Sequence, residues 1–178
     1  KKTKKIPLFP INLVVLPKEI FPLHIFEARY KDMVTNCLRK KNEFGIIYSN
    51  NNIIEDIGCS VSIEEILKKS NDGKYDLLCR GSQRFKIINR NKVNGLWYGE
   101  VNYIDEEYHG IEKKYFNHIL DKYLKFIISY DQMVDINSEL NKSDSFDFTK
   151  NFLLPNEIKQ IFLDLENEKE RLDFINDA

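Results

Sequence analysis

The stretch RFKIINRNKVNGLWYGEVNYI, residues 84–104, decides the fold class. Its first half alternates, so we expect Phe85 and Ile87 on one face of a strand. The basic residues expected on the opposite face are Arg84, Lys86, Arg90 and Lys92. Asn94-Gly95 is typical of a two-residue hairpin turn, because both residues tolerate positive φ. Alternation then resumes at Trp97, Gly99, Val101 and Tyr103. The stretch therefore predicts a β-hairpin.

The residues before this hairpin predict further strands and one helix. The expected extended or strand segments are 6–10, 19–25, 44–48, 59–67 and 75–79. Residues 70–73 form a turn between the last two, and residues 80–82 are read as a break or bulge. Apolar side chains recur at helical spacing from about Glu27 to Arg39. At least five short strands separated by turns predict a closed or half-closed antiparallel barrel with one early helix.

The chain changes character after the acidic run at residues 105–107. Helical periodicity predicts helices at about 111–133, 146–153, 157–165 and 168–175, with a polar connector at 135–144. Residues 1–100 contain 18 Lys+Arg and 11 Asp+Glu, a net charge of +7, whereas residues 101–178 contain 9 and 17, a net of −8. We therefore predict a β-rich subdomain at 1–107 and a helical subdomain at 108–178.

Composition excludes several classes of protein. No run of about 18 apolar residues exists, so no membrane span is expected. The prolines near the N-terminus and the missing cleavage site argue against a signal peptide, and we expect a cytoplasmic protein. Cys37, Cys59 and Cys79 are too few and too widely spaced for a disulfide framework or a zinc site. A net charge of −1 disfavours nucleic acid as the partner.

Several motifs in order resemble the N-terminal domain of Lon proteases. The opening IPLFPINLVVLP, residues 6–17, and PLHIFEARY, residues 22–30, closely resemble the start of that domain. GKYDLLCRGSQRFKI, residues 73–87, is similar to its hairpin. LLPNEIKQ, residues 153–160, and Glu170-Arg171-Leu172 are similar to its helical part. Ala28 stands where the family usually has Pro.

The resemblance implies an α+β fold: an N-terminal PUA-like antiparallel β pseudo-barrel with one early helix, followed by a C-terminal helical bundle. In Lon, this region helps to select and hold substrate polypeptide and supports assembly. The sequence has no GxxxxGK[ST] phosphate loop, and the Ser–Lys dyad of the family lies in a separate domain. We therefore expect a free-standing, non-catalytic module that acts in protein quality control or as an adaptor. Its expected partner is unfolded or partly folded polypeptide or a partner protein, and self-association is left open.

The residues predicted to contact a peptide are Leu23, His24, Ile25, Phe26, Arg29, Tyr30 and Trp97. The alternative, which we favour for the apolar ones, is that they fill the core at a strand-to-helix corner. The basic strip formed by Arg84, Lys86, Arg90 and Lys92 has three readings. It contacts RNA phosphates, as in an RNA-binding PUA-like module, or it is a solvated strand face, or it docks the acidic second half of the chain or a partner. We favour the solvated face.

A hydrolase is the third alternative, and the sequence supports it least. His109 and His118 have no partners at metal-ligand spacing, and no nucleophile and base can be paired from the sequence. We therefore predict no catalytic residue, no metal ligand and no cofactor.

Overall fold

The computed structural model describes residues 2–106, 111–130, 134–150 and 152–178. Contacts divide the chain into two compact units. The first comprises Lys1–Ile104 with Pro155–Leu163, and the second comprises Asp105–Leu154 with Asp164–Ala178. The predicted boundary at 107/108 differs from this division in two segments: residues 105–107 group with the helices, and residues 155–163 group with the strands.

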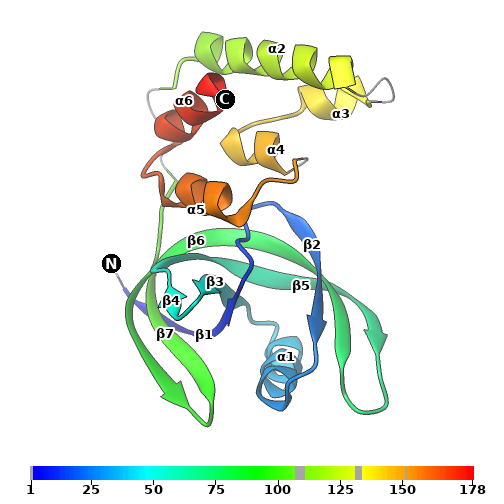
Figure 1. The fold of residues 1–178 in the computed structure, drawn as a ribbon, viewed down its shortest axis with the longest axis vertical. Coiled ribbons are helices and arrows are strands. Elements are labelled where there is room, and N and C mark those ends of the chain that lie inside the picture. The colour runs from blue at the N-terminus through cyan, green and yellow to red at the C-terminus, as the bar shows by residue number, and fades with distance from the viewer. Residues whose placement is uncertain (1, 107–110, 131–133, 151) are drawn as a thin grey trace. The chain divides into compact units, whose positions relative to one another are not determined.

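The first unit is built on one seven-stranded sheet (Figure 1). Its elements are β1 (Lys4–Ile11), β2 (Ile20–Ile25), α1 (Ala28–Lys40), β3 (Phe44–Asn50), β4 (Ile53–Ile54), β5 (Ile57–Lys69), β6 (Tyr75–Val93), β7 (Leu96–Tyr103) and α5 (Asn156–Asp164). The strand order is β1-β7-β6-β5-β3-β4, and β2 pairs with β6. Because β1 also pairs with β3, five strands form a closed ring of pairings.

One pairing departs from the expected antiparallel arrangement. β1 and β3 are parallel, with Leu8 opposite Gly45, whereas the other pairs are antiparallel. A parallel pair needs a long crossover between its strands. The segment that contains β2 and α1 provides this crossover, and the sequence pattern alone does not reveal it.

A break or bulge was expected at residues 80–82, and the structure has a bulge, not a break. The strand β6 is continuous over 19 residues, and its register with β5 shifts between the pairs Cys59–Arg84 and Val61–Gly81. Gly81 is opposite this irregularity. A Cβ atom at Gly81 would lie 2.2 Å from the carbonyl oxygen of Leu16, so only glycine allows the loop before β2 to approach this closely.

Apolar side chains from both sheet and helix form the core of the first unit. Phe9, Tyr30 and Phe44 are buried together, with ring centroids of Phe9 and Tyr30 4.2 Å apart. A second cluster around Phe85 fills the space among β1, β6 and β7. The apolar face of α1 contributes Met33, Val34 and Cys37 to the first cluster, as its helical periodicity predicted.

Polar contacts attach α5 to the strand-rich unit. The side chain of Asn156 accepts a hydrogen bond from the backbone N–H of Val14 at 3.0 Å and donates one to the carbonyl of Asn12 at 3.2 Å. Lys159 forms an ion pair with Glu19. These contacts explain why residues 155–163 belong with the strands despite their distance along the chain.

The second unit contains helices. They are α2 (Lys113–Tyr130), α3 (Ile136–Leu140), α4 (Ser145–Thr149) and α6 (Glu168–Asp177). The expected connector at 135–144 thus contains a short helix, which Asp135 caps through the N–H of Asn137. The end of the long helix predicted at 111–133 lies outside the described residues, as does His109.

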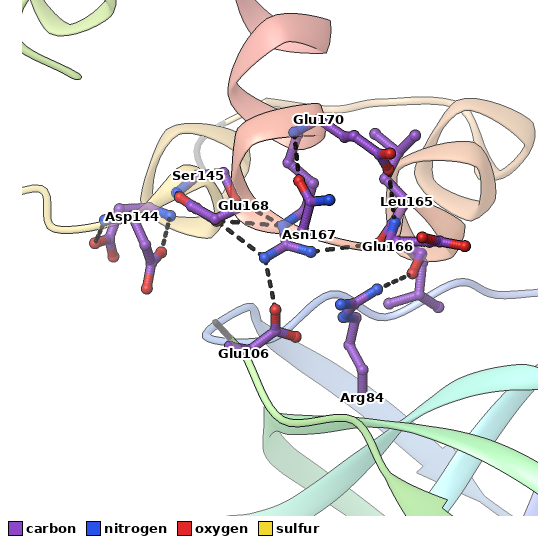
Figure 2. Close-up of polar contacts among 12 residues, drawn as sticks. Arg84, Glu106, Asp144, Ser145, Leu165, Glu166, Asn167, Glu168 and Glu170 are labelled. Carbon is purple, nitrogen blue, oxygen red and sulfur yellow. Dashed lines mark hydrogen bonds and ion pairs between the residues drawn. The ribbon is translucent and has the colours of Figure 1, made fainter. Parts of the chain in front are cut away.

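A buried charged network ties α6 to the rest of the second unit (Figure 2). Arg171 is fully buried and contacts Glu168 at 3.0 Å and Glu106 at 2.6 Å. The hydroxyl of Ser145 donates a hydrogen bond to Glu168 at 2.7 Å. Burial raises the pKa of Glu168 even though these partners favour its charged form. The network is therefore structural, because its groups satisfy one another inside the unit.

Candidate functional site

The strand β2 lies at an edge of the sheet. It pairs with β6 from Ile20–Arg80 to Ile25–Tyr75, and no second strand pairs with it among the described residues. Pro22 stands in the middle of β2 and has no N–H to donate, which is tolerated on an edge strand. An edge strand with an open side is a template for pairing with another extended chain.

The side chains of β2 alternate between core and solvent. Phe21, Leu23 and Ile25 are buried. The exposed side chains are Ile20, Pro22, His24 and, directly after the strand, Phe26; we call these four residues the β2 outer row. Ile20 and Phe26 are 53% and 57% exposed. At about 3.3 Å per residue the row is about 20 Å long, which matches a short extended peptide.

The surface around the β2 outer row is mainly apolar, and it includes the charged carboxylate of Asp76. The ring of His24 stacks on Phe26 with centroids 5.7 Å apart, and its Nδ1 atom contacts the carboxylate of Asp76 on β6. Leu78 stands opposite Pro22 and is half-buried. Among the described residues, the hydrogen-bond partner of the His24 ring is Asp76, and it is not a Ser or Cys side chain.

The structure changes which predicted peptide contacts remain available. Leu23, Ile25 and Tyr30 are buried in the core at 8%, 1% and 5% exposure, so they are not available for the predicted contact with a peptide. His24 and Phe26 stay on the surface. For Leu23 and Ile25 the reason is the two-residue period of β2, which places neighbouring residues on opposite faces, whereas Tyr30 lies on the buried face of α1.

Arg29 and Trp97 are engaged within the chain itself. Arg29 donates a hydrogen bond from Nη1 to the carbonyl of Gly95 at 2.9 Å and pairs with Glu27, so it holds the start of α1 against the β6–β7 turn. Trp97 is half-buried, and cations of Arg90 and Lys92 lie 5.4 and 5.3 Å from its ring centroid. Trp97 pairs with Leu8 and Lys92, not with the part of β6 that faces β2.

Arg84, the first residue of the predicted basic strip, is not on the surface. Arg84 is 1% exposed, and its Nη1 atom donates a hydrogen bond to the carbonyl of Leu163 at 2.7 Å (Figure 2). Phe85 faces the barrel interior, and α5 covers the opposite face of β6 at Arg84, so both neighbours are buried. Lys86, Arg90 and Lys92 are exposed. The strip expected to contact RNA is therefore reduced to three residues.

Sequence reasoning missed two features of the first unit. Ile20 and Pro22 belong to the exposed row, and the alternation of residues 20–26 was the signal that would have found them. The second feature is a cavity of about 460 Å³ beside β1, the end of α1 and β7. We call it the lysine cavity, because Lys4, Lys5, Lys40 and Lys41 line it.

Other kinds of site find no support within residues 2–106, 111–130, 134–150 and 152–178. No group of three or more His, Cys, Asp or Glu side chains lies close enough together to hold a metal ion. None of the helices described there combines the length and apolar character needed to cross a membrane.

Comparison with known proteins identifies the fold. The crystal structure of a Lon N-terminal domain protein from Xanthomonas campestris is similar with a TM-score of 0.77 at 23% identity, covering 97% of both chains. The N-terminal domain of a Mycobacterium avium complex Lon protease gives a TM-score of 0.73 at 16% identity, covering 98% of this chain and 97% of that one. These likenesses confirm a Lon N-terminal domain-like fold.

The sequence comparisons agree with the structural ones. Lon protease 2 of Syntrophobacter fumaroxidans is 23% identical over 113 residues, which cover 58% of this chain and only 14% of the length of that relative. The family model of the ATP-dependent protease La (LON) substrate-binding domain matches residues 5–178. The chain therefore belongs to the LON substrate-binding domain family.

Proposed function

We propose that this protein is a non-catalytic module that binds unfolded or extended polypeptide, and that the β2 outer row with the open edge of β2 is its binding site. The observation that carries the proposal is the combination of an unpaired strand edge with a row of exposed apolar side chains. Backbone groups at such an edge hydrogen-bond any extended chain, while alternate side chains contact the row. This combination suits recognition of many sequences.

The apolar members of the row supply the binding energy in this proposal. Ile20 and Phe26 are each about half exposed, so covering one of them is worth about 1 kcal/mol. Membership in a substrate-binding family supports polypeptide as the ligand. A role in protein quality control, in which the module presents polypeptide to a protease or acts as an adaptor, follows from the same proposal.

Fluorescence anisotropy with a labelled, uncharged, apolar peptide of about ten residues tests the site. The double variant Ile20→Gln/Phe26→Gln removes the two exposed apolar side chains, and we expect its Kd to rise about 30-fold. Ile53→Gln is the matched control, because Ile53 is 65% exposed on β4 and lies outside the row. Its Kd should change less than about twofold.

An unchanged Kd in the double variant, with a native circular dichroism spectrum, would refute this location of the site. An absence of binding to any apolar peptide in the wild-type protein would refute the proposed function itself.

A further inference from the structure

The lysine cavity is separate from the β2 outer row, and four lysine residues line it together with several apolar residues. Lys4 and Lys5 come from β1, and Lys40 and Lys41 from the end of α1. Apolar lining residues include Ile6, Met33, Cys37 and Leu96, all of which are buried. The volume of about 460 Å³ is within the range of ligand-binding pockets in proteins.

The positive charge of this cavity is largely uncompensated. Its lining contains one carboxylate, that of Glu43, against four lysines, which leaves a net charge of +3. None of the four lysines forms an ion pair with any residue in the described ranges. Glu100 stands opposite Lys5 in the strand register but makes no ion pair with it. Such a cavity attracts anions.

Two of the lysines are held in place by aromatic rings. The Nζ atom of Lys5 lies 5.3 Å from the ring centroid of Tyr98, and that of Lys4 lies 5.9 Å from that of Tyr103. Cation–π contacts of this kind orient an ammonium group without neutralising its charge.

The helix dipole explains only part of this arrangement. Lysines at the C-terminal end of a helix complement its partial negative charge, which accounts for Lys40 and Lys41. Lys4 and Lys5 lie on a strand, where no such dipole exists. Their convergence with the helix end on one cavity therefore needs another explanation, and an anionic ligand provides it.

The lining suits carboxylates carried on a chain with apolar parts. No arginine lines the cavity, so an anion there would meet separate lysine side chains and not a bidentate guanidinium fork. Separate lysines around an apolar floor suit spaced carboxylates on a chain with apolar parts.

We propose that the lysine cavity binds the carboxylates of acidic, partly apolar polypeptide segments, and thereby makes the module prefer such segments. The inference rests on the proposed function in that its ligand is a polypeptide, but it uses a different site.

Peptides of matched sequence test this preference. One peptide carries two Glu residues in an apolar context, and its control carries Gln at the same positions. Wild-type protein should bind the Glu peptide about tenfold more tightly, as expected for two partly exposed ion pairs. Lys5→Gln/Lys40→Gln should abolish this difference, and Lys4→Gln/Lys41→Gln is a second variant built from the same two elements.

The matched control is Lys86→Gln/Lys92→Gln, which removes the same charge from exposed positions of β6. It should retain the preference for the Glu peptide. Equal binding of both peptides by the wild type overturns the inference, as does equal loss in the control variant. Displacement of the Glu peptide by inorganic phosphate, but not by succinate at equal ionic strength, also overturns it in favour of phosphate groups.

The failure of this inference is distinct from the failure of the proposed function. If the Gln peptide binds and its affinity depends on Ile20 and Phe26, polypeptide binding stands whatever the lysine variants do. If neither peptide binds, both proposals fail together.

Discussion

Replacing Gly81 by Ala should destabilise the strand-rich unit strongly, because the new methyl group has no room. Its Cβ would lie 2.2 Å from the carbonyl oxygen of Leu16, which is backbone and cannot rotate away. The loop must move, and this strains two hydrogen bonds: Lys18 N–H to the Gly81 carbonyl at 2.9 Å, and Gly81 N–H to the Glu19 carbonyl at 2.8 Å.

The magnitude follows from these contacts. Loss of two backbone hydrogen bonds costs about 2 kcal/mol, and overpacking adds about 1–3 kcal/mol. Alanine also makes the unfolded chain stiffer, which stabilises the folded state by about 0.5–1 kcal/mol. The net decrease in the free energy of unfolding is therefore about 3 kcal/mol. Trp97 is the single tryptophan and lies in this unit, so its fluorescence during urea unfolding reports the effect.

With an m-value of about 2 kcal/mol/M, the urea midpoint of Gly81→Ala should fall by about 1.5 M. Gln83→Ala is the control, because Gln83 is exposed on the same strand and its loss should change the stability by less than about 0.5 kcal/mol. A Gly81→Ala midpoint within about 0.3 M of the wild type would show that the loop does not need to approach β6 this closely.

Three further outcomes are expected. Arg84→Ala removes a buried charged donor and leaves its carbonyl partner without this hydrogen bond, so urea unfolding followed by Trp97 should show a loss of about 2–4 kcal/mol; a loss below about 0.5 kcal/mol would contradict the burial. Burial raises the pKa of Glu139, but hydrogen bonds from Lys142 and Tyr123 and nearby lysines outweigh it and leave this pKa below its ordinary value. The stabilisation by Glu139 is therefore present above the unfolded-state pKa and is lost as pH falls through the folded-state pKa. Calorimetry should show that Glu139→Gln is less stable than the wild type at pH 7, and that this difference in stability disappears at acidic pH. Burial raises the pKa of the Cys37 thiol to about 11, so iodoacetamide should label it at least about 100-fold more slowly in the folded protein than in urea at pH 8, and equal rates by mass spectrometry would refute this.

Local patterns were sufficient for many elements of the fold. Alternation and the Asn94-Gly95 turn correctly predicted the β6–β7 hairpin, with both turn residues at positive φ. Helical spacing placed α1 within one residue at each end. Both signals are local, because they depend on backbone geometry and on which side of an element is apolar.

The candidate site was only partly predictable for a physical reason. His24 and Phe26 were among the predicted contacts and stay exposed, but Leu23 and Ile25 on the same strand are buried. A strand pattern shows that alternate residues face opposite ways, but the tertiary packing decides which face is covered. Arg84 illustrates the same point. Its side chain is buried because α5, about 80 residues further along the chain, covers that face of β6.

The amino-acid sequence by itself determined the strands, the early helix, the helical C-terminal part and the resemblance to Lon N-terminal domains, because each of these follows from local periodicity, turn residues or short motifs. Only the tertiary structure decided that β1 and β3 pair in parallel, that β2 exposes Ile20, Pro22, His24 and Phe26 along an open edge, and that lysines from a strand and a helix line one cavity. These features depend on contacts between residues far apart in the chain, whose loop-closing and packing energies no local pattern contains.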